Sequence, residues 1–128
     1  MSVDLRHPIK RARGLGSAKD GTHHFVVQRI TAIALVFLSL YVVTLIVGSI
    51  GDDYATVRAT VGKPWNATLL AAFVIAMFWH AKLGIQVVIE DYVHTPLLAG
   101  ASHLINIFVC VLAAIASVLA VIRIALGV

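Results

Sequence analysis

A histidine stands near the middle of a long apolar segment of this sequence. His80 lies about ten residues, or ~15 Å of helix, before the charged end of that segment at Glu90. Ionisable side chains are costly deep in a membrane, and an imidazole is too short to reach the interface from there. A neutral histidine at that depth needs a hydrogen-bonding side chain, a proton path or a metal, and membrane haem proteins use such a histidine as an axial ligand. His80 alone leaves these alternatives open.

A stripe of residues follows His80 along the same helix face. At 100° per residue, Gly84, Val87 and Asp91 fall within about 60° of it. Gly84 either leaves room for a flat macrocycle near the backbone or lets two helices pack closely. Asp91 and Tyr92 end the stripe at the interface, where a tyrosine alone is typical of the aromatic belt. A carboxylate beside a phenol could also hydrogen-bond and protonate a lipid-soluble carbonyl compound.

The number of histidines at this depth bears on the haem alternative. A six-coordinate haem needs two axial ligands, and no second histidine lies at the depth of His80. The others lie before the first apolar segment or after the second: His7, His23, His24, His94 and His103. If His80 holds low-spin haem, the second ligand therefore comes from another chain. Lys82, also inside the segment, either snorkels or faces a neighbouring subunit or a polar cofactor edge.

Three apolar segments must position these side chains. They cover about 30–50, 68–89 and 104–126, in a chain that is 60% hydrophobic and 12% charged. Each exceeds the roughly 20 residues that cross a ~30 Å hydrocarbon core, and a helix satisfies its own backbone hydrogen bonds there. A soluble bundle would need polar stripes that these segments lack. We therefore predict an all-α integral membrane protein, a single domain over residues 1–128 with three transmembrane helices.

Basic residues set the expected orientation. Six of the ten Lys and Arg residues precede the first span, mostly within a basic arm over residues 1–24. The positive-inside rule places this arm on the cytoplasmic or matrix side, with the loop at 90–103 on the same side. The net charge of +4 is thus a topology signal, and we expect no nucleic-acid partner.

Two sequence motifs resemble a known family. Residues 80–84 and 91–92 (HAKLG and DY) resemble the His-x-x-x-Gly…Asp-Tyr signature of the small membrane-anchor subunit of succinate dehydrogenase, or complex II. Residues 21–25 and 28–32 (GTHHF and QRITA) are similar to the Gly-x-His-x-Phe…Arg-x-Thr-Ala segment that opens the first helix of that family. The resemblance covers nearly the whole chain from residue 21.

The resemblance implies a role for several residues. It makes His80 an axial ligand of haem b, with the other axial histidine on the cytochrome b subunit, the second membrane anchor of the complex. It makes Tyr92 a hydrogen-bond donor to the headgroup of ubiquinone or menaquinone, with Asp91 in the same pocket. Arg29 matches an arginine of the family that lies near the haem propionates. His23 matches a family histidine in the same region, although either histidine of the 23–24 doublet could align with it.

The function expected from the resemblance is that of an anchor and electron-delivery subunit. A flavoprotein partner would oxidise succinate in the tricarboxylic acid cycle, an iron–sulfur partner would pass the electrons on, and this chain would itself be non-catalytic. We expect a multi-pass protein of the bacterial inner membrane rather than the mitochondrial one. The alternatives are a small transporter, which would need a carboxylate inside the spans, and a free-standing b-type cytochrome, which the single mid-membrane histidine argues against.

Overall fold

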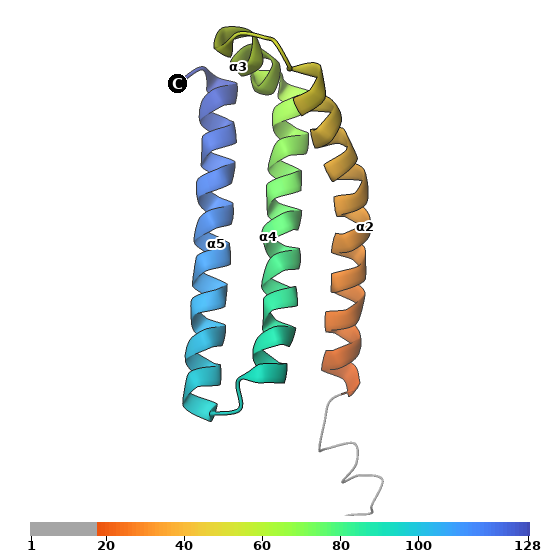
Figure 1. The fold of residues 1–128 in the computed structure, drawn as a ribbon, viewed down its shortest axis with the longest axis vertical. Helices are drawn as coiled ribbons and strands as arrows, with labels where there is room; N and C mark the ends of the chain where they lie inside the picture. Colours follow the sequence, from red (N-terminus) through yellow and green to blue (C-terminus); the bar gives the residue numbers. More distant parts are fainter. Residues whose placement is uncertain (1–17) are drawn as a thin grey trace, which may run out of the picture.

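Three long helices make up most of the molecule (Figure 1). A computed structural model describes residues 18–128, which contain α2 (Ala18–Gly48), α3 (Tyr54–Gly62), α4 (Pro64–Tyr92) and α5 (Pro96–Leu126). The three long helices are each long and apolar enough to cross a membrane, and the described residues contain no strand. These features confirm the predicted all-α fold with three transmembrane helices.

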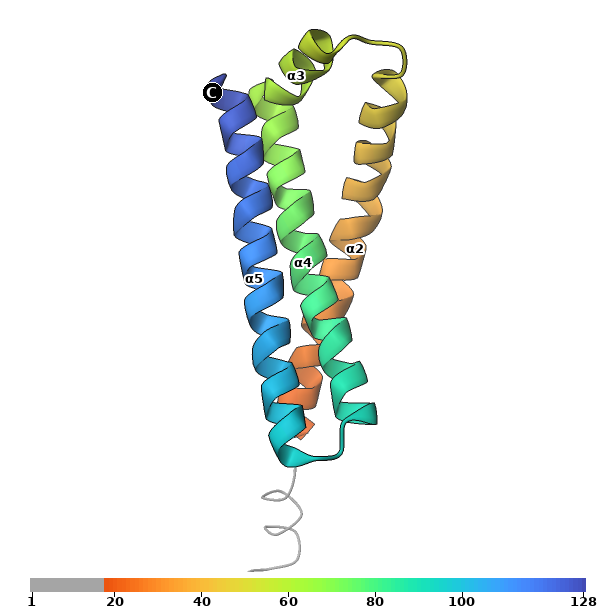
Figure 2. The same cartoon turned by 60° about the vertical axis from the view of Figure 1, so that its left-hand side comes forward.

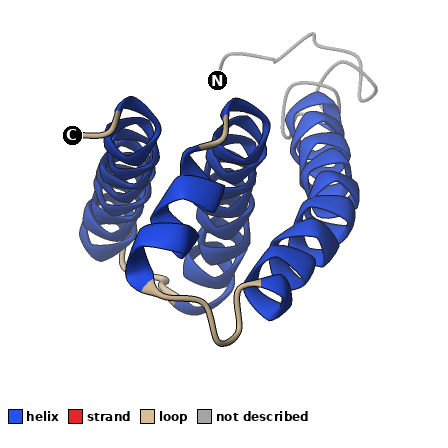
Figure 3. Cartoon of the chain, turned by 90° about the horizontal axis from the view of Figure 1, so that it is seen from above, coloured by secondary structure: helices blue, strands red, loops and turns tan. Residues whose placement is uncertain are grey.

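The helices form an open row with α4 in the middle. α4 packs against α2 on one side and α5 on the other, whereas α2 and α5 make no contact with each other. Figure 2 and the view from above in Figure 3 show this arrangement, with α3 lying across one end of the row. Consecutive long helices are antiparallel, as expected from short connections. The row therefore has two broad faces on either side of α4.

The described residues bury few side chains within this row. The buried set consists of Ala67, Leu83, Ile89, Asn106 and Cys110. Most large apolar side chains are exposed, which suits a surface that faces lipid or another subunit. Packing between membrane helices depends on close contact and on polar groups rather than on a large apolar core.

The helices begin earlier than the apolar segments predict. α2 starts at Ala18, so the part of the expected arm from residue 18 to residue 24 is helical, and α5 starts at Pro96. The expected loop at 90–103 shrinks to a turn at 93–95. Apolar segments mark only the lipid-soluble part of a helix, and proline at the first helical position loses no needed hydrogen bond. The basic residues at 6–13 lie outside the described residues, and the predicted orientation stays a prediction.

Polar contacts join three helices at the α3 end. The Tyr41 hydroxyl of α2 donates to Asn66 Oδ1 of α4 at 2.6 Å, and Asn66 Nδ2 donates to the Thr60 carbonyl of α3 at 2.6 Å. Gly62 allows α3 to approach α5, because a Cβ there would lie 3.2 Å from the Ile124 carbonyl oxygen. These contacts fix one end of the row, and His80 lies nearer the other.

Candidate functional site

His80 bridges α4 and α2. It is partly buried and lies twelve residues, or ~18 Å, before the end of α4 at Tyr92. Its Nδ1 lies 3.0 Å from Thr31 Oγ1, and its Nε2 lies 3.3 Å from Gln28 Nε2. Both ring nitrogens therefore face polar atoms of α2, which accounts for an imidazole this deep in an apolar helix.

A polar stripe on α2 forms the other side of this seam. His24, Gln28 and Thr31 are spaced by four and three residues, which places them on one helix face. The sequence prediction missed Gln28 and Thr31 as partners of His80. The signal was their helical spacing across the start of the first apolar segment, but the spacing does not say which helix the stripe faces.

Two atoms of the stripe are buried without a hydrogen-bond partner. They are His24 Nε2 and Gln28 Oε1. Buried polar atoms are nearly always paired, and an unpaired one costs free energy. The seam between α2 and α4 thus has polar groups that a further molecule could satisfy.

Gly84 lies one turn from His80 on the same side of α4. A Cβ added to Gly84 would lie 3.7 Å from Gln28 Nε2, which is ordinary van der Waals contact. Packing against α2 therefore does not require glycine here, and Gly84 leaves space close to the imidazole. An imidazole with a glycine one turn away, and with Gln28 on the facing helix keeping an unpaired Oε1 atom, is compatible with the edge of a haem group.

His80 is a single candidate ligand rather than part of a cluster. Among residues 18–128, no three His, Cys, Asp or Glu side chains gather as a metal-binding group. A haem iron needs only one axial ligand from each side, so the donor set of this chain is compatible with haem shared between two chains.

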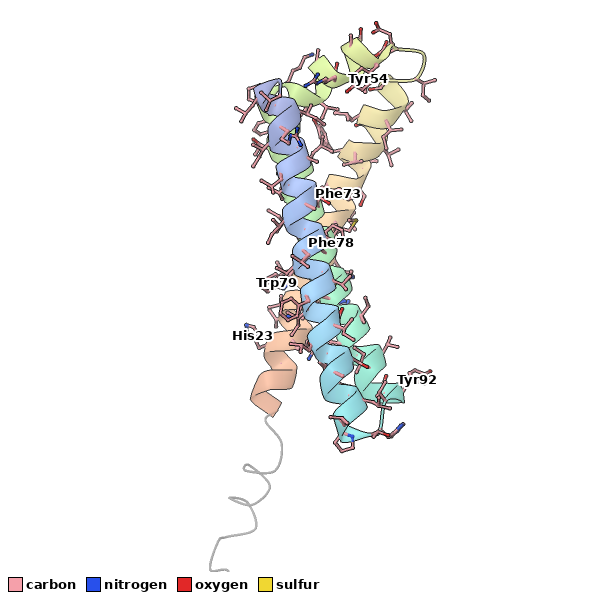
Figure 4. The ribbon with its side chains drawn as sticks, turned by 90° about the vertical axis from the view of Figure 1, so that its left-hand side faces the viewer. His23, Tyr54, Phe73, Phe78, Trp79 and Tyr92 are labelled. Atoms are coloured by element: carbon pink, nitrogen blue, oxygen red, sulfur yellow. The ribbon has the colours of Figure 1, made fainter. Side chains whose placement is uncertain are left out.

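Asp91 and Tyr92 are exposed at the end of α4. The Tyr92 side chain is 78% exposed, and successive helical residues point about 100° apart. No hydrogen bond joins the two side chains in the described structure, so within this chain both are free to contact another molecule. Figure 4 shows Tyr92 on the opposite side of the row from His23 and Trp79.

Arg29 and His23 do not converge. Six residues along a helix separate their directions by about 120°, and Arg29 instead stacks over the Phe25 ring with its Cζ 5.0 Å from the ring centroid. The exposed His23 lines a hollow of about 270 Å³ together with residues of α4 that include Trp79 and Lys82. The two residues expected near one haem edge thus lie on different faces of α2.

Lys82 does not extend toward the nearer end of its helix. Its Nζ lies 5.3 Å from the centroid of the Trp79 ring, one turn toward the middle of α4. Its carbonyl accepts a 2.9 Å hydrogen bond from Nδ2 of the buried Asn106, which links α4 to α5. Lys82 also borders an apolar groove of about 380 Å³ between these two helices. Lys82 therefore belongs to the face that carries Trp79.

Comparison with known proteins gives consistent similarities. Residues 4–121 match the model of the succinate dehydrogenase/fumarate reductase transmembrane subunit family. A succinate dehydrogenase hydrophobic membrane anchor subunit of Rickettsia bellii is 42% identical over 73% of this chain and 74% of its own length. The corresponding subunit of Rickettsia conorii is 32% identical over 94% of this chain and 96% of its own length. That of Paracoccus denitrificans is 35% identical over 66% of each chain. No solved structure matches the fold of the chain significantly.

Proposed function

Because the chain belongs to the succinate dehydrogenase/fumarate reductase transmembrane subunit family and is a membrane anchor of succinate dehydrogenase, we propose that it also holds haem b and completes a quinone site. The anchor role agrees with three helices that can span a membrane. The finer roles of individual residues rest on their contacts.

The position of His80 supports haem ligation most directly. Its imidazole lies at mid-span, partly buried, with Nε2 facing a single side-chain amide, that of Gln28. In this proposal His80 Nε2 would hold haem b together with a histidine of the cytochrome b subunit. Haem, when bound, supplies a one-electron carrier within the membrane.

Arg29 is the residue of this chain that we propose for the haem propionates. It is exposed near the start of the first span, and a guanidinium makes strong charge-assisted hydrogen bonds with carboxylates. Its contact with Phe25 is a cation–π interaction of about 0.5–1 kcal/mol at an exposed site, so Arg29 can leave it for a carboxylate. His23 points to another face of α2 and is not part of this proposal.

Tyr92 and Asp91 are proposed to act at the quinone. The exposed Tyr92 hydroxyl donates a hydrogen bond to a carbonyl of ubiquinone or menaquinone, and the Asp91 carboxyl supplies a proton nearby. Electrons come from succinate through the flavoprotein and iron–sulfur subunits, so this chain binds and orients rather than oxidises. The bacterial relatives and the basic residues before the first span support a bacterial inner membrane with an inside N-terminus.

Replacing His80 by alanine tests haem ligation. In the assembled complex, the variant should lose the low-spin haem spectrum of the native protein, because one strong-field axial ligand is removed. A matched control is His103→Ala, which removes a half-exposed histidine from α5. An unchanged visible spectrum in His80→Ala would show that His80 is a packed histidine bonded to α2 and not a ligand.

A further inference from the structure

We infer that Thr31 is a positioning residue for His80: its hydroxyl accepts the Nδ1 proton and so leaves the Nε2 lone pair free for iron. The inference rests on the proposed haem ligation and extends it to α2. The carrying observation is the 3.0 Å contact between Thr31 Oγ1 and His80 Nδ1. Neither the motif on α4 nor that on α2 assigns a partner to either atom.

The direction of this hydrogen bond follows from the surroundings of the hydroxyl. Thr31 Oγ1 lies 2.9 Å from the Val27 carbonyl oxygen and 3.0 Å from that of Gln28. A carbonyl can only accept, and a hydroxyl has one proton, which helical threonines commonly donate to a carbonyl three or four residues earlier, here that of Gln28 or Val27. The lone pairs of Thr31 Oγ1 then face the ring, so His80 Nδ1 carries the proton and donates it.

Gln28 supports the same tautomer from the other side of the ring. Its Nε2 lies 3.3 Å from His80 Nε2, and an amide nitrogen can only donate. With the amide in this orientation His80 Nε2 accepts, and the proton is then on Nδ1. The opposite tautomer would place two N–H donors against each other. Two contacts from neighbouring turns of α2 thus specify one protonation pattern.

The consequence for a bound iron is electronic as well as geometric. A hydrogen bond from the distal ring nitrogen fixes the plane of an axial imidazole and raises its basicity. A more basic ligand stabilises ferric over ferrous iron and lowers the midpoint potential of the haem. Haem held at His80 Nε2 would replace the contact with the Gln28 amide, which is the longer of the two, and Thr31 would keep its contact with Nδ1.

The test compares valine and serine at position 31 in the assembled complex. Thr31→Val keeps the β-branched shape and removes the hydroxyl, so the midpoint potential of the haem should rise. The rise should correspond to at most a roughly ten-fold change in the relative binding of the two oxidation states, or about 59 mV for one electron. Thr31→Ser should restore the native potential. Thr44→Val is the matched control, because that hydroxyl on α2 bonds only a backbone carbonyl.

The possible outcomes distinguish a failure of this inference from a failure of the haem-ligation proposal on which it rests. A native potential and a native electron paramagnetic resonance spectrum in Thr31→Val, with an altered spectrum in His80→Ala, would overturn the role of Thr31 and leave haem ligation standing. A native spectrum in His80→Ala would overturn both. If the valine variant does not accumulate, Thr31→Ala against Thr31→Ser gives the same comparison, and equal potentials in that pair would overturn the inference.

Discussion

The polar side chains inside the helices differ in whether their hydrogen bonds are complete. Tyr41 and Asn66 satisfy each other across α2 and α4, and Asn106 bonds the backbone of α4. Gln28, which contacts His80, and His24, one turn before it on α2, in contrast each keep a buried atom without a partner. Complete pairs hold helices together, whereas incomplete ones indicate a site for a further molecule.

The sequence predicted only part of this site. His80 could be found because an ionisable residue deep in an apolar segment is rare, and the same apolar pattern located α4 as a span but not its ends. Thr31 and Gln28 could not be assigned to His80, because their contacts depend on how α2 is rotated and shifted against α4. No local signal in either segment specifies that register.

The Tyr92 hydroxyl provides a prediction that concerns a single side chain. Tyr92→Phe keeps the ring at the interface and removes the group proposed to bond the quinone carbonyl. Leaving a largely buried acceptor unpaired costs about 1–3 kcal/mol, which corresponds to a roughly ten- to hundred-fold loss of quinone-dependent turnover. Succinate oxidation with a soluble dye that accepts electrons upstream should be spared. Tyr54→Phe, which changes an equally exposed phenol at the other end of the row, should alter neither rate. An unchanged ratio of the two activities in Tyr92→Phe would place the quinone elsewhere.

At the level of elements, hydropathy located the helices but not their ends. The apolar segments were correct as spans, yet α5 continues before its segment as far as Pro96. α3 was not predicted at all, since its nine residues carry no long apolar run. Its start is instead set by a local cap, in which Asp53 accepts a 3.0 Å hydrogen bond from the Thr56 backbone N–H.

The cap makes the stability of α3 depend on pH. Hydrogen bonding from the Thr56 side chain, and then from the Thr56 backbone N–H, lowers the pKa of Asp53 below its usual value of 3.8. A lowered folded-state pKa means that the charged cap stabilises α3 above pH 3.8 and that this stabilisation is lost as the pH falls through the folded pKa. The protection factors of the α3 amides, which are corrected for the intrinsic exchange rate at each pH, should therefore fall on acidification. Asp53→Asn, which caps without titrating, should remove the pH dependence, and Asp53→Ala should lose protection at every pH. Equal protection in all three proteins would refute a role for the cap.

The molecule as a whole leaves two faces of its helix row uncovered. Two faces of the row are open because α2 and α5 do not meet, and the described residues bury only five side chains. The faces differ in chemistry: one carries Trp79 and the other carries Tyr92 (Figure 4). Viewed down the axis of α4, Gly84 is rotated by about 40° from His80 in the direction of Tyr92. A partner that supplies the second axial histidine should therefore cover the Tyr92 face.

Bulky substitutions on the two faces of α4 test this assignment. Val88 lies about 80° from His80 toward Tyr92, and Ile75 lies about 140° away in the other direction. Both side chains are about half exposed, at 55% and 51%, so the free chain should accept tryptophan at either position. Val88→Trp should reduce both the haem content and the amount of the cytochrome b partner that co-purifies, because the larger ring would separate the two chains. Ile75→Trp should leave both near native, since Ile75 borders the groove of about 380 Å³ between α4 and α5, which has room for the ring. The reverse result, with loss only in Ile75→Trp, would place the partner on the Trp79 face and assign Lys82 to that interface.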